Sequence, residues 1–228
     1  MSSFTQLGPD IDGEALGDQS GYSVSLSSDG SVLAIGAREN DGNGSGSGHT
    51  RIYQWDSASS SWNQLGSDID GEAAEDKSGH SVSLSTDGSI VAIGAYANDG
   101  NGNSSGHTRI YKWNGSSWNQ LGSDIDGESA NDNSGYSVSL SSDGSVLAIG
   151  AYNNDANGAD SGHTRIYKWD GSSWNQLGSD IDGEAAGDQS GRVSLSSDGS
   201  VLAIGASTND GNGSDSGHTR IYKWNGSS

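Results

Sequence analysis

The ten residues Ser-Asp-Gly-Ser-Val-Leu-Ala-Ile-Gly-Ala at 142–151 decide the fold, because the chain repeats them. The same ten residues occur at 28–37 and 197–206. A close variant, in which Thr, Ile and Val replace Ser, Val and Leu, occurs at 86–95. The aspartates of the four copies lie 58, 56 and 55 residues apart. Self-similarity at such a period is the signature of a repeat architecture, and it covers essentially the whole chain.

Each copy predicts four short β-strands. In the first, Val and Leu alternate with Ser, and a Ser-Thr-Asp-Gly turn then leads into an apolar run with small residues. A polar loop follows, and a link of four residues, or of six between Trp55 and Trp62 in the first copy, joins the last two strands into a hairpin. In the second copy the expected strands are 81–85, 89–95, 107–113 and 118–122. Because no helical periodicity interrupts this pattern, the expected fold class is all-β.

A tryptophan pair flanks the last hairpin in each of the first three copies. The pairs are Trp55 with Trp62, Trp113 with Trp118, and Trp169 with Trp174. A four-residue hairpin loop places its flanking residues opposite each other, and such pairs bury a large apolar area. We therefore expect these rings in the core rather than stacked on a sugar.

The two ends of the chain suggest how the repeats close. The repeat units are 2–59, 60–115, 116–171 and 172–228, which together form one domain, 1–228. The fourth unit stops before its last strand, whereas residues 3–8 match that strand. We expect this N-terminal strand to complete the last blade of a β-propeller, with Phe4 opposite Trp224 and Leu7 beside them. The ring has four blades if one chain closes it, or eight blades in a homodimer, which we favour.

The composition is unusual for a folded chain. Leu, Ile, Val and Phe make up only about 15% of the residues and the net charge is −20, which is typical of disorder, so order rests on the repeat. No Cys is present, which excludes disulfides and thiolate metal sites. Thirty acidic against ten basic residues argue against nucleic acid or anionic membrane as partners. No leader or membrane-spanning pattern occurs, and the compartment stays open.

Two motifs resemble known propeller families. Residues 138–151, followed by Thr-Arg-Ile-Tyr-Lys-Trp at 164–169, resemble a WD-repeat blade. Ser-Gly-Tyr-Ser-Val at 134–138 and Ile-Gly-Ala at 149–151 resemble the FG-GAP blades of integrin α-chains. Both resemblances imply a β-propeller that serves as a binding platform. Integrin-type calcium loops lie between the first two strands, where this chain has only a tight turn, so that calcium site is not carried over.

The loops between successive copies, here called the interblade loops, carry carboxylates at their first, third, fifth and ninth positions. These candidate calcium ligands are Asp10, Asp12, Glu14 and Asp18; Asp68, Asp70, Glu72 and Asp76; Asp124, Asp126, Glu128 and Asp132; and Asp180, Asp182, Glu184 and Asp188. Their spacing resembles calcium loops, but Gly stands at position four and no Glu closes the loop at position twelve. The alternative is a solvated turn whose Asp side chains cap backbone N–H groups.

The remaining polar motifs do not predict an enzyme. The histidines that open the third strand, at 49, 107, 163 and 218, lack the short spacing of a local zinc site, and we expect them to hydrogen-bond the start of that strand. No nucleophile elbow occurs, and every carboxylate set is repeated. We expect a non-catalytic scaffold or interaction module: an amplified, truncated or engineered symmetric repeat. The alternative is a lectin-like or calcium-dependent adhesion module, whose acidic loops would bind a protein or glycan.

Overall fold

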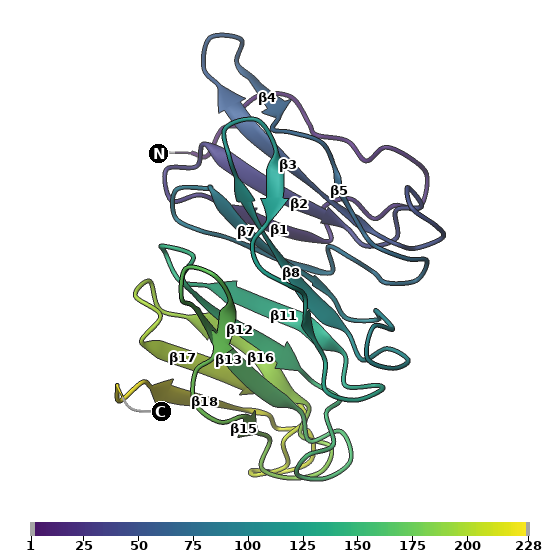
Figure 1. Cartoon of the computed structure of the whole chain (residues 1–228), viewed down its shortest axis with the longest axis vertical. Helices are drawn as coiled ribbons and strands as arrows, with labels where there is room; N and C mark the ends of the chain where they lie inside the picture. Colours follow the sequence, from purple (N-terminus) through teal and green to yellow (C-terminus); the bar gives the residue numbers. More distant parts are fainter. Residues whose placement is uncertain (1–2, 227–228) are drawn as a thin grey trace.

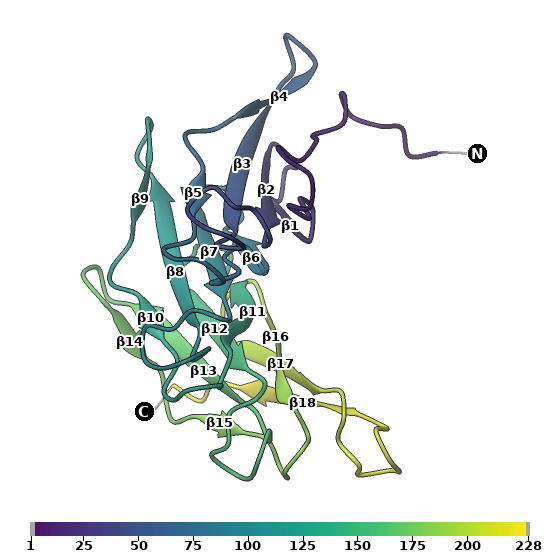
Figure 2. The same cartoon turned by 90° about the vertical axis from the view of Figure 1, so that its right-hand side faces the viewer.

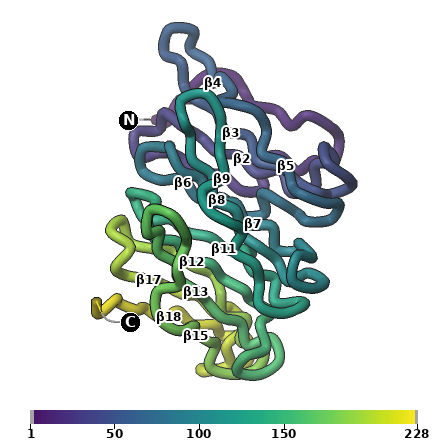
Figure 3. The backbone as a smooth tube through the Cα atoms, in the orientation of Figure 1, coloured from purple at the N-terminus to yellow at the C-terminus, as the bar shows by residue number. Residues whose placement is uncertain are grey.

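The computed structural model describes residues 3–226, which form four antiparallel sheets that follow one another along the molecule (Figures 1 and 3). We call these sheets blades 1 to 4. Blade 1 holds β1 (Ser23–Leu26), β2 (Val32–Ala37), β3 (His49–Asp56), β4 (Ser61–Gln64) and β5 (Ile69–Asp70). Blade 2 holds β6 (Ser81–Leu84), β7 (Ile90–Ala95), β8 (His107–Trp113), β9 (Trp118–Gln120) and β10 (Ile125–Asp126). Blade 3 holds β11 (Ser134–Leu140), β12 (Val146–Ala151), β13 (His163–Trp169), β14 (Trp174–Gln176) and β15 (Ile181–Asp182). Blade 4 holds β16 (Ser190–Leu195), β17 (Val201–Ala206) and β18 (His218–Lys223).

The strands of each blade pair in chain order, and the predicted all-β class is confirmed. The fourth strand differs from prediction because it is split. In blade 2, β9 pairs with the end of β8, and after a break β10 pairs with its start, at His107 and Thr108. The short second piece belongs to the interblade loop, so this loop is anchored to the third strand of the blade it leaves.

The predicted turn and tryptophan pairs are both present. In the turn between β6 and β7, the Asp87 carboxylate accepts hydrogen bonds from the Ser85 hydroxyl at 2.7 Å and from the Ser89 N–H at 2.9 Å. Trp113 lies opposite Trp118, with ring centroids 5.5 Å apart. The pairs in blades 1 and 3 have the same register, at 5.4 and 5.5 Å.

The apolar core lies between the blades. One cluster joins Ile90, Ile110 and Ile125 of blade 2 to Leu140 and Leu147 of blade 3. Equivalent clusters join blade 1 to blade 2 and blade 3 to blade 4. Because each blade buries its faces against its neighbours, a low content of large aliphatic residues is sufficient for a core.

Small residues in the first two strands let the blades approach closely. The Ser81 hydroxyl donates to the Gly135 carbonyl of the next blade at 2.7 Å, and the Ser83 hydroxyl accepts from the Leu140 N–H at 3.0 Å. A Cβ atom on Gly94 would lie only 2.0 Å from the Gly135 oxygen. The serines and glycines that suggest disorder by composition therefore hold neighbouring blades together by short polar contacts.

Within residues 3–226 the structure shows no ring closure by a single chain. Blade 4 has three strands, residues 3–22 form no strand, and Phe4 is fully exposed, so it does not pair with Trp224. The N-terminal segment lies at the blade 1 end of an open arc, whereas β18 lies at the opposite end (Figure 2). The predicted strand completion is therefore absent from a single chain, and the structure is an arc rather than a closed four-bladed ring.

The shortened first strand of the fourth copy keeps its register. Val193 faces Ile204 and Leu195 faces Leu202, as Val138 and Leu140 do with their partners in blade 3. The missing residue is absorbed between Ser190 and Arg192, where the pairing shifts. The deletion therefore shortens the irregular start of β16, where blade 3 has its own shift between Ser134 and Ser137, and leaves the apolar positions in place.

Candidate functional site

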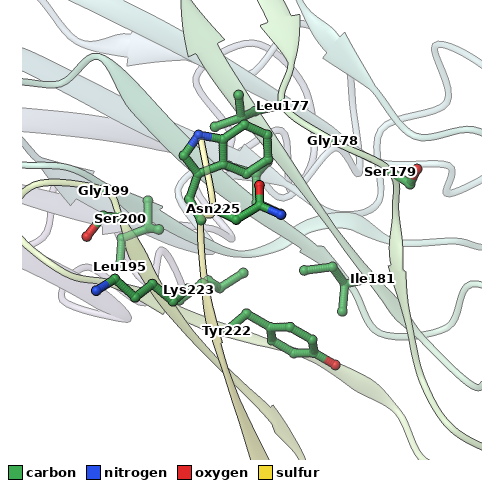
Figure 4. A pocket seen from close by; sticks show the side chains of 13 residues that line it. Leu177, Gly178, Ser179, Ile181, Leu195, Gly199, Ser200, Tyr222, Lys223 and Asn225 are labelled. Carbon is green, nitrogen blue, oxygen red and sulfur yellow. The ribbon is translucent and has the colours of Figure 1, made fainter. Parts of the chain in front are cut away.

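A groove marks the outer edge of blade 4, where a fourth strand is absent. It has a volume of about 390 Å³, and its apolar lining comes from Leu177 and Ile181 of blade 3 and from Leu195, Tyr222 and Trp224 of blade 4 (Figure 4). In blades 2 and 3 a tryptophan of the fourth strand lies at this position. The Trp118 indole donates to the Leu65 carbonyl and the Trp174 indole to the Leu121 carbonyl, each at 2.8 Å. The groove is thus the place of one missing strand and its aromatic ring.

The N-terminal segment contacts blade 1 as a fourth strand of a preceding blade would. The Trp62 indole donates to the Leu7 carbonyl at 3.1 Å, which repeats the Trp118–Leu65 contact. A Cβ on Gly8 would lie 2.7 Å from the Trp55 ring, just as one on Gly66 would lie 2.9 Å from the ring of Trp113. Of the three residues predicted to close the ring, Leu7 is therefore docked on blade 1, Trp224 borders the groove, and Phe4 touches neither.

The acidic residues of the interblade loops make a different contact at each of the four positions, through the side chain or through the backbone. The first accepts a hydrogen bond from a glutamine amide, at 2.8 Å for Gln6–Asp10 and 2.5 Å for the three later copies. At the third, the backbone carbonyl of the Asp accepts from an arginine, as Asp126 does from Arg165 at 2.5 Å. The ninth is buried, and the Asp76 carboxylate caps the Ala73 N–H at 2.9 Å. This contact is the cap that the alternative interpretation predicts at that position.

The fifth position lies beside the third strand. Glu72 has one carboxylate oxygen 3.7 Å from the Arg109 guanidinium and the other 3.7 Å from Nδ1 of His107. Burial raises the pKa of Glu72, while Arg109 acts in the opposite direction. Burial lowers the pKa of His107 to about 4, and Arg109 adds to this effect. The His107 ring is therefore neutral at pH 7 and its nitrogens can act as ligands or hydrogen-bond partners.

The structure brings together carboxylates from different interblade loops rather than the four of one loop. Among the described residues, three groups place a His nitrogen and two carboxylate oxygens within 4.8 Å of one another: Glu14 with His49 and Asp68, Glu72 with His107 and Asp124, and Glu128 with His163 and Asp180. Calcium binding by the single loops stays a prediction. Each group combines the fifth position of one loop, the histidine of the next blade, and the first position of the following loop.

The sequence analysis did not connect the histidines with these carboxylates, because it looked for ligands within one loop. The signal was available in the repeat. Each of the three histidines has a Glu 35 residues before it and an Asp 17 or 19 residues after it. In stacked repeats, residues at fixed offsets in neighbouring copies become spatial neighbours.

A second cavity, of about 510 Å³, lies at the start of the first strands and involves Tyr22, His80, Tyr136 and Arg192. Tyr22, His80 and Tyr136 occupy equivalent positions in the first three copies, whereas Arg192 pairs with Gly205 as Ser137 pairs with Gly150, so this is a point where the otherwise similar repeats differ. His80 stacks on Tyr22, Tyr96 and Tyr136, with ring centroids 4.9, 4.5 and 4.7 Å apart. Burial lowers the pKa of His80 to about 4, with Arg38 and Arg192 contributing.

Comparison with known proteins supports the repeat interpretation. Residues 69–111 and 125–167 match the model of the FG-GAP repeat. A candidate 6-phosphogluconolactonase from Bacteroides uniformis is 12% identical with a TM-score of 0.59, covering 90% of this chain and 50% of its own. The hydrazine synthase of Kuenenia stuttgartiensis is 16% identical with a TM-score of 0.52, covering 89% of this chain and 58% of its own. At such identities the likeness concerns the fold alone.

The chain spans between half and three fifths of the length of these two structures. No curated protein matches it in sequence. Within residues 3–226 there is no helix whose length and apolarity would suit a membrane crossing.

Proposed function

We propose that this β-propeller repeat protein, which carries FG-GAP repeats, is a non-catalytic binding scaffold that completes its ring with a second copy of the chain. One observation carries the proposal. The outer face of blade 4 and the outer face of blade 1 carry residues equivalent to those that pack against each other wherever two blades of the chain meet.

The outer face of blade 4 presents residues that are buried elsewhere. Ile221 is 72% exposed, whereas its counterparts Ile52 and Ile110 are 1% and 0% exposed. On the outer face of blade 1, Leu26 is 57% exposed, whereas its counterpart Leu84 is 8% exposed. Inside the chain, Ile52 and Leu84 lie in one cluster. Ile221 of one copy and Leu26 of another therefore have the chemistry and register to form the same contact.

The groove and the N-terminal segment complement each other in the same way. The groove holds Trp224 but lacks the second ring of a tryptophan pair, and the fully exposed Phe4 occupies the sequence position of Trp118 and Trp174. Leu7 and Gly8 already sit on blade 1 of their own chain. Docking blade 1 of a second copy against blade 4 would bring residues 3–8 along β18 and cover both apolar faces at once.

Two such contacts would join two copies into an eight-bladed ring. The interface is head-to-tail, so each copy contributes one face of each kind, and a closed ring covers both end faces of the arc. The interblade loops would then form a continuous acidic rim, suited to a protein or glycan partner with cationic groups or to bridging metal ions. Catalysis is not part of the proposal, because the carboxylate sets repeat from blade to blade and none is distinguished as an acid–base pair.

Light scattering coupled to gel filtration tests the assembly. We expect twice the 23.2 kDa chain mass for the wild type and a shift to the single-chain mass for Phe4→Asp. Ser116→Asp, at an exposed residue between β8 and β9 of the interior blade 2 and away from both outer faces, is the control and should keep the wild-type mass. A wild-type mass of 23.2 kDa at every concentration would overturn the proposal, as would an unchanged mass for Phe4→Asp.

A further inference from the structure

The three groups of one histidine and two carboxylates share one arrangement. The histidine begins the third strand of a blade, one carboxylate comes from the interblade loop before that blade, and the other from the loop after it. The group in blade 3, which we call the blade 3 triad, consists of Glu128, His163 and Asp180. The triads of blades 1 and 2 are Glu14, His49 and Asp68, and Glu72, His107 and Asp124.

The histidine of the blade 3 triad is buried and lacks a partner. His163 is 1% exposed, and its Nδ1 has no hydrogen-bond partner among the described residues. This atom points at the carboxylate of Glu128, but the 3.7 Å to Oε2 is too long for a hydrogen bond. A buried polar atom without a partner costs free energy. Something that binds between Nδ1 and the carboxylates would remove this cost.

Each triad glutamate, and also Asp68, has one oxygen in contact with an outer partner and directs the other toward the histidine. Oε1 of Glu128 lies 3.8 Å from the Arg165 guanidinium, while Oε2 faces His163. In the blade 1 triad, Asp68 accepts a hydrogen bond from Gln64 through Oδ1, while Oδ2 lies 3.8 Å from Nδ1 of His49. Metal-binding carboxylates are oriented by such outer contacts, which fix the oxygen that remains for the ion.

We propose that each triad binds a divalent first-row transition ion of the zinc class through one imidazole nitrogen and two carboxylate oxygens. Metal–ligand bonds of about 2.0–2.2 Å in a tetrahedral site place ligand atoms about 3.4 Å apart. The His-to-Glu distances of 3.7–3.8 Å need only a small contraction. The ligand atom of Asp180 lies within 4.8 Å of the other two in the blade 3 triad, and both carboxylates of this triad are exposed enough to move closer. A fourth position remains for water or a ligand atom.

The ligand set selects zinc-class ions over calcium. Calcium takes six to eight oxygen ligands, whereas a triad offers one nitrogen and two carboxylates, and imidazole nitrogen suits zinc, copper or nickel. The arginine beside each Glu offsets part of the negative charge of the triad. This weakens the binding of an ion such as calcium, which is held mainly by charge. An ion that forms a directional bond to neutral imidazole is affected less. The net charge of −20 still concentrates cations near the rim.

The fourth copy has only two of the three ligands. His218 lies 3.5 Å from Glu184, but the Asp of the next interblade loop has its sequence counterpart at Asp10, near the start of the chain. Asp10 accepts a hydrogen bond from Gln6 at 2.8 Å, the contact that orients Asp68 in the blade 1 triad. If two copies join as proposed above, Asp10 of the second copy completes this site. This extension rests on the proposed assembly, whereas the three triads within the chain do not.

Metal binding to the metal-free chain tests the proposal, with Zn²⁺ as the probe. Titration calorimetry and elemental analysis should give three Zn²⁺ per chain in a monomeric sample and four in an assembled one. His163→Gln should lower the count by one. His80→Gln removes a buried histidine outside the triads and should leave the count unchanged. A wild-type chain that binds no Zn²⁺, or a count that His163→Gln does not change, would overturn the proposal.

Two further measurements guard against a folding defect and separate the two proposals. Asp180→Asn keeps an acceptor for Gln176 but removes a charged ligand, so it should also lose one Zn²⁺, and the visible absorption of bound Co²⁺ should fall by about a third in the monomer. An Asp180→Asn chain with all its Zn²⁺ and unchanged Co²⁺ absorption would contradict the triads. Asp10→Asn should leave the three triads loaded and lose an ion only from the assembled form.

Discussion

Equivalent residues of different copies form the boundary between blades 2 and 3 and the outer faces of blades 1 and 4. They are buried at the boundary and exposed at the outer faces. Ile110 is completely buried between two blades, whereas Ile221, its counterpart in blade 4, is 72% exposed. Leu140 is 7% exposed in the interior, and Leu26 is 57% exposed at the outer face of blade 1. The comparison shows that the core of this protein belongs to the boundaries between copies. A copy buries the apolar residues of a face only where a neighbouring copy covers that face.

The largest expected effect comes from removing the same isoleucine on the two sides of this comparison. Ile110→Ala should lower the free energy of unfolding by about 2–5 kcal/mol, because it leaves a cavity in a packed boundary. Ile221→Ala should change it by less than about 0.5 kcal/mol in the dissociated chain, since the side chain is solvated. Urea denaturation of both variants in the Phe4→Asp background measures these values without assembly.

The same pair of variants also tests whether the outer face of blade 4 takes part in dimer formation. In the chain with native Phe4, we expect Ile221→Ala to weaken the dimer and to make the unfolding midpoint more dependent on protein concentration. An equal loss of stability for Ile110→Ala and Ile221→Ala in the dissociated chain would mean that the outer face of blade 4 is already covered by its own chain.

A glycine pair gives the next largest effect. Gly94 and Gly205 occupy the same position in blades 2 and 4, but a Cβ on Gly94 would lie 2.0 Å from a backbone oxygen, and one on Gly205 has no atom nearer than 3.6 Å. Gly94→Ala should therefore destabilise the chain by about 1–3 kcal/mol. Gly205→Ala should be neutral or stabilise the dissociated chain by up to about 1 kcal/mol, since Ala loses less entropy on folding.

Thermal and urea unfolding of the two glycine variants in the Phe4→Asp background checks this contrast. In the assembled form, Gly205 would face the backbone of the next copy as Gly94 does, so Gly205→Ala should also lower the fraction of dimer. If Gly94→Ala is tolerated as well as Gly205→Ala, the close approach of blades 2 and 3 is not required for stability.

The comparison also explains which parts of the fold the sequence could predict. The strands, the Asp87 turn and the Trp113–Trp118 pair depend on residues close in sequence, and the repeat pattern predicts them correctly. The split of the fourth strand into β9 and β10 was not predicted, because it depends on how the interblade loop packs against β8. Phe4 was assigned to the last blade from its sequence match alone, which does not tell whether the same chain can reach that place.

The candidate sites also divide into those that depend on residues close in sequence, which could be predicted, and those that depend on distant segments, which could not. The caps made by the ninth carboxylate, such as Asp76, are local and were one of the two predicted alternatives. The triads require Glu128, His163 and Asp180 from three segments, and a search within one loop cannot find them. Repeats make such sites accessible to prediction only when residues of neighbouring copies are compared as spatial neighbours, because each boundary places the same offsets side by side.

The smallest expected effect concerns pH, at a position where the copies differ. His80 of blade 2 is 7% exposed between aromatic rings, whereas its counterpart Tyr22, on the outer face of blade 1, is 46% exposed. Burial, with Arg38 and Arg192, lowers the pKa of His80 from 6.5 to about 4. Between these values the unfolded chain binds a proton that the folded chain does not. The stability linked to neutral His80 is therefore complete above about pH 6.5 and is lost as the pH falls toward 4.

Replacing His80 with the tyrosine of the neighbouring copies should remove this part of the pH dependence. We expect the unfolding free energy of His80→Tyr to fall less between pH 7 and pH 4.5 than that of the wild type, both measured with a chelator present. The other four histidines are present in both chains, so the difference between the two curves isolates His80. Parallel curves would mean that His80 is already protonated within the folded chain at pH 4.5, and that the ring cluster is open to water like the face around Tyr22.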